Sequence, residues 1–175
     1  MIDVDLLKEV RVVPDFPKKG IQFFDITTVL QNPEAYQFAV EEMVRAVKNM
    51  PCDVIVGLES RGFLFASPVA YNLGKSLVLA RKKGKLPYKT VSQSYGLEYG
   101  EDVFEMHEDA IRPGQNVVII DDLLATGGTT QATVKLVEKL GGKVTGIVCL
   151  IELEDLGGRQ KLSVDNVVSL IKTTE

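Results

Sequence analysis

Two adjacent aspartates, Asp121 and Asp122, follow the apolar run VVII, and a short run of small residues comes soon after them. That run consists of Ala125, Thr126, Gly127, Gly128 and Thr129. A glycine-rich turn at the start of a helix presents unpaired backbone N–H groups to an anion, so this loop suits a phosphate. The two carboxylates suit the vicinal hydroxyls of a sugar, and they could also hold the waters of a magnesium ion. The pattern favours a sugar phosphate, and the alternative is an ordinary strand-to-helix turn capped by Thr129.

A second group of candidates for anion binding is mostly basic. Directly after the apolar run VIVGL come Glu59, Ser60 and Arg61. The stretch RKKGKLP adds three cations, which are Arg81, Lys82 and Lys85. Clustered cations attract anions, although a solvated surface loop is the ordinary explanation for such a cluster.

Two common nucleotide-binding motifs do not occur in the sequence. The glycine loop has no lysine where G-x-x-x-x-G-K-[ST] requires one, and G-x-G-x-x-G is found nowhere. The one histidine, His107, has no evident partner for metal binding or nucleophilic catalysis, and we assign it no role.

The candidate residues must be positioned by strands and helices that alternate along the chain. Strands are expected at 53–58, 76–80, 117–121, 144–151 and 167–171, where the sequence is apolar at nearly every position. Helices are expected at 33–50, 62–73 and 129–140, and the middle one is apolar nearly all round, so we expect it to be buried on all sides. The alternation predicts an α/β fold with a mostly parallel, twisted sheet flanked by helices. Such sheets bind ligands at the carboxyl ends of their strands.

One segment, about residues 82–109, breaks this alternation. It is polar, contains tyrosines and glycines, and is longer than most connections in such folds. The alternation in TVSQSY and DVFEMH favours an antiparallel hairpin over a disordered loop. We therefore expect a flexible β-hairpin flap that closes over the site and excludes water.

The composition indicates a single domain spanning residues 1–175. Hydrophobic residues make up 45% of the chain and charged residues 25%, and the net charge of −4 argues against a nucleic-acid partner. Cys52 and Cys149 form no C-x-x-C pattern, which indicates reduced thiols and a cytoplasmic protein. The N-terminus shows no secretory signal, and no apolar run reaches the ~18 residues needed to span a bilayer, so no membrane partner is expected.

Taken together, these stretches resemble the type I phosphoribosyltransferases, which bind 5-phosphoribosyl 1-diphosphate (PRPP). VVIIDDLLATGGTT matches the family pattern of a hydrophobic strand, an acid pair and A-T-G-G-T. Five further stretches narrow the resemblance to the adenine phosphoribosyltransferase family. They are FPKKGIQFFDITTVL (16–30), LESRGFLFASPVAYNLG (58–74), RKKGKLP (81–87), SYGLEYG (94–100) and LIELEDLGGRQKL (150–162). They occur in the family's order and cover essentially the whole chain.

The resemblance implies a purine salvage reaction that transfers the phosphoribosyl group of PRPP to N9 of adenine, giving AMP and diphosphate. It implies Mg²⁺ on the diphosphate and ribose with no dedicated protein ligands, held through water by Asp121 and Asp122. It also implies a homodimer in which the basic residues of RKKGKLP reach the diphosphate from the neighbouring subunit. A small hood is expected from about residues 1–32 together with C-terminal residues.

The resemblance also assigns roles to single residues. The expected catalytic residues are Glu98, Asp121 and Asp122, with Glu98 as the acid/base group near N7 of the purine. PRPP is expected to contact Glu59, Ser60, Arg61, Arg81, Lys82, Lys85, Tyr99, Asp121, Asp122, Ala125, Thr126, Gly127, Gly128 and Thr129. The peptide bond between Glu59 and Ser60 is expected to be strained or cis.

Adenine recognition is assigned to GIQFFDIT and to Leu153. Phe23 is expected to stack on the base, with Leu153 packing on its other face. The backbone groups of Gln22 and Phe24 are expected to recognise the exocyclic amine and N1. The family usually has a basic residue at the position of Phe24, so any contact of that basic side chain is lost here, and packing in the core is the alternative role for one of the two phenylalanines.

Three other functions are weaker interpretations of the sequence. A phosphoribosyltransferase for another base, such as xanthine or orotate, would not explain the matches outside the phosphate motif. A regulator that senses PRPP would need a DNA-binding segment, and the enzyme-like motifs begin by Phe16. A binding protein without activity is disfavoured because the acid pair, the basic cluster and Glu98 are all present.

Overall fold

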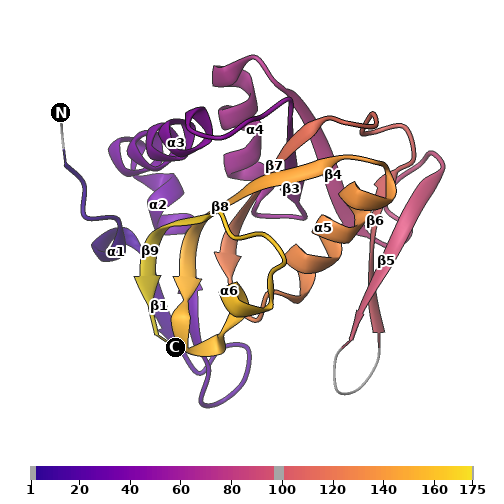
Figure 1. Ribbon diagram of the computed structural model, residues 1–175. Coiled ribbons are helices and arrows are strands. Elements are labelled where there is room, and N and C mark those ends of the chain that lie inside the picture. The colour runs from indigo at the N-terminus through magenta and orange to yellow at the C-terminus, as the bar shows by residue number, and fades with distance from the viewer. Residues whose placement is uncertain (1–2, 97–100, 175) are drawn as a thin grey trace.

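A seven-stranded sheet forms the centre of the protein, as a computed structural model shows for residues 3–96 and 101–174 (Figure 1). Its strands are β3 Val54–Leu58, β4 Ser76–Lys82, β5 Thr90–Gly96, β6 Glu101–His107, β7 Asn116–Leu124, β8 Lys143–Leu153 and β9 Val167–Thr173. Their order in the sheet is β5-β6-β4-β3-β7-β8-β9. The strands β4, β3, β7, β8 and β9 run parallel, and β5 and β6 add an antiparallel pair at one edge. The predicted mostly parallel sheet is therefore confirmed.

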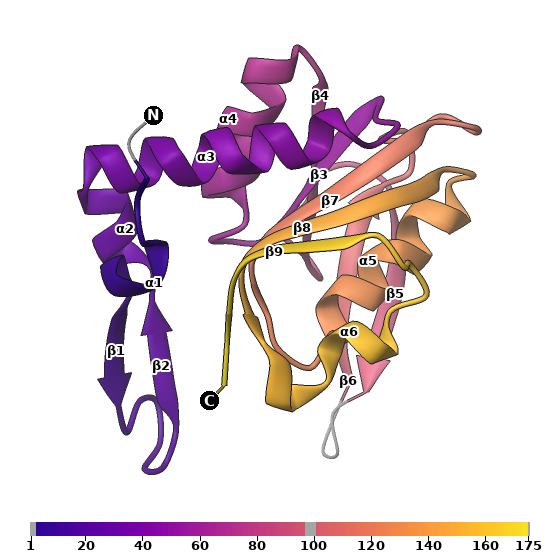
Figure 2. The same ribbon diagram turned by 60° about the vertical axis from the view of Figure 1, so that its left-hand side comes forward.

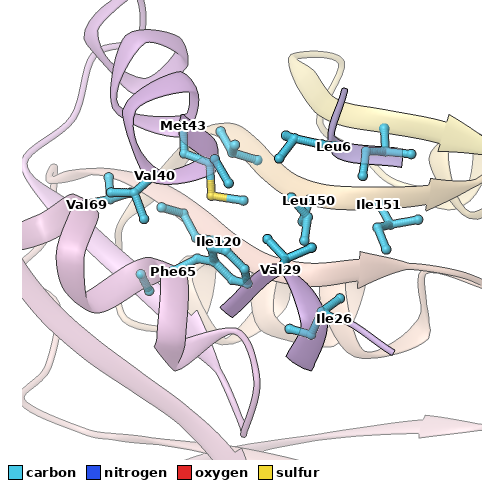
Figure 3. Packing of buried hydrophobic residues seen from close by; sticks show 14 of the residues in the cluster. Leu6, Ile26, Val29, Val40, Met43, Phe65, Val69, Ile120, Leu150 and Ile151 are labelled. Carbon is cyan, nitrogen blue, oxygen red and sulfur yellow. The ribbon is translucent and has the colours of Figure 1, made fainter. Parts of the chain in front are cut away.

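Three long helices pack on the sheet, and they are α3 Pro33–Lys48, α4 Phe63–Leu73 and α5 Gly128–Lys139. α3 and α4 cover one face and α5 covers the other (Figures 1 and 2). In β7, Val118 and Ile120 belong to the core cluster that includes residues of α3 and α4 (Figure 3). Their neighbours Val117 and Ile119 belong to the cluster that includes residues of α5. Because successive residues of a strand point to opposite faces, a strand between two helical layers is apolar at every position.

α3 begins at Pro33 as predicted but ends at Lys48, two residues before the predicted end, and α5 lies one residue earlier than the predicted 129–140. The Asn32 side chain accepts hydrogen bonds from the backbone N–H groups of Glu34 and Ala35, so it caps α3 just before Pro33. The C-terminal end of α5 is at Lys139, and Gly141 follows it with a left-handed φ of 85°, which is typical of a residue just after a helix.

The prediction that α4 is buried on all sides is wrong. Phe65, Ala66 and Val69 are fully buried, whereas Leu64 is 41% exposed and Tyr71 is 89% exposed. The sheet and α3 cover only one side of the helix, so the apolar outer side is open in the single chain.

β7 is longer than the predicted strand 117–121. Its pairing with β8 continues beyond the acids, with Leu123 opposite Ile151 and Leu124 opposite Glu152. β8 also extends beyond the predicted 144–151 and therefore supplies the extra backbone partners. The acid pair consequently lies within the strand and not at its end.

Residues 82–109 contain the predicted hairpin. β5 and β6 pair antiparallel, from Thr90 opposite His107 to Gly96 opposite Glu101. The base of the hairpin is joined to the main sheet because β6 also pairs with the end of β4. Phe104 of β6 is buried in the same core cluster as residues of α5. The hairpin is therefore rooted in the core.

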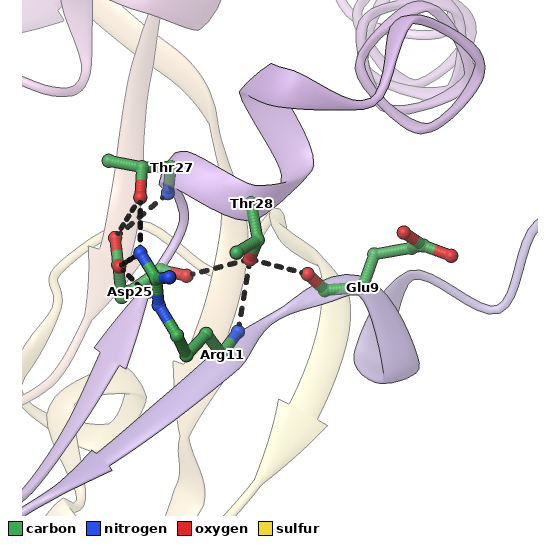
Figure 4. A network of polar contacts seen from close by, with 5 residues as sticks. All are labelled: Glu9, Arg11, Asp25, Thr27 and Thr28. Atoms are coloured by element: carbon green, nitrogen blue, oxygen red, sulfur yellow. Dashed lines mark hydrogen bonds and ion pairs between the residues drawn. The ribbon is translucent and has the colours of Figure 1, made fainter.

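The N-terminal segment forms a small unit beside the sheet, made of α1 Leu6–Glu9, β1 Arg11–Pro14, β2 Gln22–Asp25 and α2 Thr27–Gln31. β1 and β2 form an antiparallel hairpin that projects away from the main sheet (Figure 2). Asp25 fixes its base by accepting hydrogen bonds from Thr27 Oγ1 at 2.7 Å and from Arg11 Nε at 3.0 Å (Figure 4). These contacts, led by that from Thr27, lower the pKa of Asp25 to about 2.

The remaining C-terminal elements are η1 Glu154–Leu156 and α6 Gly158–Lys161, between β8 and β9. Cys52 and Cys149 are both free thiols, as expected. Among the helices of residues 3–96 and 101–174, none is long and apolar enough to cross a membrane.

Candidate functional site

A cavity of about 410 Å³ opens at the carboxyl ends of the neighbouring strands β3 and β7. Its lining consists of Glu59, Ser60, Arg61, Lys82, Lys85, Asp121, Asp122, Leu123 and Thr129. All of these except Leu123 are binding residues expected from the sequence. The fold therefore brings the acid pair, part of the basic cluster and the start of α5 to one place.

Asp121 and Asp122 both line the cavity but have different partners. Arg61 Nε lies 2.6 Å from Asp122 Oδ2, so Asp122 is held in an ion pair. Asp121 Oδ1 accepts a hydrogen bond from the backbone N–H of Asp122 at 2.8 Å. Burial, followed by the charge of Asp122, raises the pKa of Asp121 well above its ordinary value. Asp121 therefore favours a ligand that brings hydroxyl donors or a positive charge.

The glycine loop leaves backbone N–H groups available at the start of α5. Gly127 is the N-cap residue with a φ of 83°, a left-handed conformation that other residues rarely adopt. Within the part of the chain that the structure describes, no side chain caps α5, and its first turn holds no acid. The alternative in which Thr129 caps the helix is therefore wrong. An uncapped helix start beside a cavity is suited to an anion.

Glu59 is the centre of the basic cluster. Its Oε1 accepts hydrogen bonds from Arg81 Nε at 3.0 Å and from the Lys82 backbone N–H at 3.1 Å, and its Oε2 lies 2.6 Å from Lys85 Nζ. Its side chain is only 6% exposed. Burial alone would raise the pKa of Glu59, but the hydrogen bonds, led by that from Lys85, hold it below its ordinary value. Both oxygens of the Glu59 carboxylate are therefore paired with cationic side chains. Arg81 lies beside Glu59 but does not line the cavity.

The turn after β4 is held by a second buried acid. The backbone N–H of Gly84 donates to Glu105 Oε2 at 3.1 Å, and Glu105 is buried in β6. This contact fixes the turn from which Lys85 reaches Glu59 and the cavity. Two acids, one directly after β3 and one in β6, therefore orient the basic cluster from either side of β4.

The hairpin contacts the site through Tyr95 and Asp102. The Tyr95 hydroxyl donates to Asp102 Oδ2 at 3.1 Å, and Lys82 Nζ lies 3.9 Å from the same oxygen. Burial and the contact with Asp102 raise the pKa of Tyr95 to about 12. The Tyr95 ring also lies next to Gly128 at the start of α5. The hairpin is therefore in contact with both the basic cluster and the glycine loop.

The residues expected to bind adenine lie in two different environments. The guanidinium carbon of Arg61 lies 5.3 Å from the centroid of the Phe23 ring, so Phe23 is next to the cavity. Phe24 and Leu153 are buried members of one core cluster, and neither side chain lines the cavity. Gln22 is exposed on β2. The structure thus brings only Phe23 of this group beside the charged residues.

Two further expectations concern the loop after β3 and the tip of the hairpin. The peptide bond between Glu59 and Ser60 is cis, as predicted. Glu98 and Tyr99 lie outside the described residues. His107, to which we assigned no role, accepts a hydrogen bond from the Tyr88 backbone N–H at 3.4 Å.

Several residues around the cavity were missed from the sequence. Leu123 lines the cavity because β7 is longer than expected. Asp102 and Glu105 gave no signal, since acids are unremarkable in a polar segment. Gly158, whose backbone touches the glycine loop, stands in a Gly-Gly pair that could have indicated a close approach of two chain segments.

The acid pair is the best candidate for a contact with a metal ion. In residues 3–96 and 101–174, no cluster of three or more His, Cys, Asp or Glu side chains could hold a metal ion. Magnesium keeps several waters and uses one or two carboxylates together with substrate phosphates. The two adjacent carboxylates in the cavity fit a hydrated magnesium ion of this kind.

Known proteins of one kind resemble this chain over almost its full length. The family model described as the phosphoribosyl transferase domain matches residues 23–174. The adenine phosphoribosyltransferase of Caldicellulosiruptor saccharolyticus is 60% identical over 169 residues, which are 97% of each chain. The crystal structure of adenine phosphoribosyltransferase from Thermoanaerobacter pseudethanolicus has a TM-score of 0.93 and 51% identity and covers 97% of this chain and 98% of its own. That of the Saccharomyces cerevisiae enzyme, complexed with an imino-altritol bisphosphate and adenine, has a TM-score of 0.89 and 39% identity, covering 95% of this chain and 96% of its own.

Proposed function

The chain belongs to the adenine phosphoribosyltransferase family, and on this premise we propose how its residues divide the work of transferring the phosphoribosyl group of PRPP to N9 of adenine. The products are AMP and diphosphate, so the reaction salvages a purine base. One observation supports the division of roles best: a single cavity is lined by the acid pair, by Arg61 and Lys85, and by the start of α5.

The glycine loop, residues 125–129, is proposed to bind the 5′-phosphate. The uncapped start of α5 supplies backbone N–H donors and the positive end of the helix dipole. Asp121 and Asp122, separated from this loop by two leucines, accept hydrogen bonds from the ribose hydroxyls. Because burial and the charge of Asp122 raise the pKa of Asp121, hydroxyl donors that stabilise its carboxylate are suited to that position.

Charged side chains are proposed to bind the diphosphate at the other end of the cavity. Breaking the anomeric bond leaves positive charge on the ribose and negative charge on the departing diphosphate, so both charges need stabilisation. Arg61, Lys82 and Lys85 lie in the lining to receive the diphosphate, with Ser60 beside them. Glu59, which also lines the cavity, orients Lys85 and the Lys82 backbone, and Arg81 supports them from outside the lining.

Magnesium is proposed to bind with the diphosphate and the ribose, near Asp121 and Asp122. When bound, it would offset part of the negative charge of the leaving group. The protein's part is to present two carboxylate side chains on one strand, where they can accept hydrogen bonds from the waters of the ion.

Adenine is proposed to stack on Phe23, whose ring already lies against a planar guanidinium. Backbone groups of Gln22 and Phe24 would recognise the edge of the base, and Leu153 would limit the space on its other face. Phe24 has its side chain in the core, so only its backbone is available for this role. The hairpin β1–β2 would act as a hood over the base. Glu98 and Tyr99 are proposed to supply the acid/base group near N7 and a ring that covers the site.

A cytoplasmic homodimer is the proposed working form. The outer side of α4 exposes Leu64 and Tyr71, and β4 exposes Leu77 and Leu79. Exposed apolar groups that share one face are typical of protein interfaces. Arg81 and Lys82 are the last two residues of β4. A second subunit that packs on this face would therefore lie next to the basic cluster.

A substrate panel tests the proposed function. The protein is incubated with PRPP and MgCl₂ and with one base at a time, namely adenine, hypoxanthine, guanine, xanthine or orotate. AMP formation from adenine, with little nucleotide from the other bases, is the expected result. The absence of AMP, or a preference for another base, would overturn it. A reaction without PRPP is the matched control.

A further inference from the structure

The segment around Gly158 packs against the back of the glycine loop. α6 lies beside the start of α5 in both views of the molecule (Figures 1 and 2). A Cβ added at Gly158 would lie 2.2 Å from the carbonyl oxygen of Ala125 and 3.1 Å from the backbone nitrogen of Gly127. Real Cβ atoms do not approach a carbonyl oxygen so closely, and backbone cannot move aside as a flexible side chain can. Only glycine therefore allows the two backbones to touch at this point.

The contact is close from the other side as well. A Cβ added at Gly127 would lie 2.8 Å from the carbonyl oxygen of Gly158. The two glycines thus face each other, one in the loop and one in a segment about 30 positions later. The backbone of Gly158 therefore limits how far the glycine loop can move away from the cavity.

Arg159, the next residue, is held on the sheet by four hydrogen bonds, two of them to the buried acid Glu152. Arg159 Nε donates to Glu152 Oε1 at 2.8 Å and Nη2 donates to Glu152 Oε2 at 2.5 Å. Its Nη1 donates to the Val167 carbonyl at 2.7 Å, and Nη2 also donates to Ser169 Oγ at 3.1 Å. Ser169 Oγ in turn donates to Glu152 Oε2 at 2.5 Å. Such a two-pronged pair is among the more rigid side-chain contacts in proteins.

The buried acid also stands next to the loop in the sheet. Glu152 is opposite Leu124, and Leu124 immediately precedes Ala125. The hydrogen bonds from Arg159 lower the pKa of Glu152, so the pair is charged on both sides. Arg159 therefore ties α6 to the strand that neighbours the first residue of the loop.

We propose that Gly158 and Arg159 are positioning residues for the 5′-phosphate: Arg159 fixes α6 on the sheet, and the bare backbone of Gly158 holds the glycine loop at the distance that phosphate binding requires. This inference rests on the proposed function, in which that loop holds the 5′-phosphate. Neither residue lines the cavity, so both act through the loop.

Binding measurements on the full chain test the inference. Calorimetric titrations with AMP, with ribose 5-phosphate and with magnesium diphosphate are compared for the parent, Gly158→Ala and Arg159→Lys. The Kd for AMP and for ribose 5-phosphate should rise by about fivefold or more in Gly158→Ala, equivalent to about 1 kcal/mol, and less in Arg159→Lys. The Kd for diphosphate should change by less than about twofold, because the cations that bind it do not contact α6.

Gly142→Ala is the matched control. A Cβ there would lie 2.8 Å from side-chain carbons of Ile111 and Val137, which is a milder clash than that at Gly158 and lies beyond the C-terminal end of α5, away from the loop. This variant should lose stability, measured as Tm, without any selective loss of 5′-phosphate binding. Should Gly158→Ala not fold, the ratio of the AMP and diphosphate affinities in Arg159→Lys decides the matter.

The possible failures are distinguishable. If the parent itself does not bind ribose 5-phosphate or AMP, the proposed role of the loop fails. If the parent binds both and Gly158→Ala binds them equally well, the loop keeps its role and the positioning inference is overturned. An equal loss of AMP and diphosphate affinity would also overturn it, because that indicates a general structural defect.

Discussion

The two ends of the cavity provide for negative charge by different means. At the glycine loop, residues 125–129, the donors are backbone N–H groups at the start of α5, held in place by the conformation of Gly127. At the basic cluster, the donors are long side chains, and each already has an acidic partner, as in the pairs of Arg61 with Asp122 and Lys85 with Glu59. The loop is ready for its ligand, whereas the cluster must exchange partners to receive one.

This difference matches the chemistry proposed for the two ends of PRPP. The 5′-phosphate does not react, so a rigid backbone site can serve it throughout the reaction. The diphosphate leaves with increased negative charge, and side chains can move toward that charge as it develops. In the free protein, the acidic partners hold these cationic side chains at the cavity. Because the anion must compete with these acids, its affinity is lower than it would be for unpaired cations.

Replacing Arg61 should have the largest effect and tests the side-chain end. Arg61→Met leaves Asp122 without a cation beside Asp121 and removes the guanidinium from Phe23. We expect kcat/KM for PRPP to fall by about 10²–10³, the range seen when one preorganised charge-stabilising donor is removed. Initial rates of AMP formation at several PRPP concentrations provide the measurement.

Thr126→Ala is the contrasting variant at the backbone end. Thr126 is exposed, and its removal leaves every backbone N–H of the loop in place. A loss below about tenfold is expected, since one hydroxyl hydrogen bond contributes about 0.5–1.5 kcal/mol. The comparison between the two ends would fail if Thr126→Ala were as damaging as Arg61→Met.

Glu59→Gln should have an intermediate effect and tests whether the acid orients the cations. Glutamine keeps the shape but removes the charge that holds Arg81 and Lys85. The KM for PRPP should rise by about tenfold, as expected for the loss of one charged hydrogen bond of about 1.5 kcal/mol, with a smaller change in kcat. Steady-state kinetics with PRPP as the varied substrate measure both constants.

Asp102→Asn is the control for Glu59→Gln. Asp102 is half-buried, and its contact with Lys82 is longer, at 3.9 Å. A weaker, more exposed pair should alter the KM for PRPP by less than about threefold. If Glu59→Gln left KM unchanged while Asp102→Asn raised it, the cations would be organised from the hairpin and not from β3.

The two ends also differ in how far they were predictable from sequence. The glycine loop depends on contacts within a few residues, so strand, loop and helix start could be inferred from local pattern. The partners of the cations could not be inferred, because Glu59 meets Lys85 only after β3 and β4 are paired. Arg81 and Lys85 carry the same charge and stand in one short basic stretch, yet only Lys85 lines the cavity.

Predictions of burial failed where the cause was tertiary. The apolar composition of α4 indicated burial on all sides, although one side faces outward in the single chain. Phe23 and Phe24 are identical residues side by side, and the alternation of β2 sends one toward Arg61 and the other into the core. From the sequence, either phenylalanine could stack on a ligand or pack in the core. The direction in which each side chain leaves β2 decides which one does so.

The smallest expected effect concerns stability and compares the two aspartates themselves. Asp121 is half-buried beside the charge of Asp122, and its pKa is raised, so its ionised form destabilises the folded state. A group whose folded pKa exceeds its unfolded value lowers stability as pH rises from the unfolded pKa through the folded one. Asp121→Asn removes that penalty and keeps an oxygen for the Asp122 N–H. The variant should therefore match the parent near pH 4, the ordinary pKa of an aspartate, and exceed its Tm at neutral pH by about 2–4 °C, the change that about 1 kcal/mol produces in a domain of this size.

Asp122→Asn separates this effect from a general tolerance of the strand. Asp122 is buried and lies 2.6 Å from the more exposed Arg61, so removing its charge breaks a partly buried ion pair and should lower Tm, although it also relieves the repulsion on Asp121. Thermal unfolding of both variants between pH 4 and 8 without ligand provides the measurement. Opposite signs for the two variants would show that Asp121 carries a charge that the fold does not compensate and that a bound ligand must stabilise. Equal destabilisation by both variants would mean that the charge of Asp121 is already stabilised within the free protein. The proposed contrast between the glycine loop, which is ready for its ligand, and Asp121, which lacks a stabilising partner, would then be wrong.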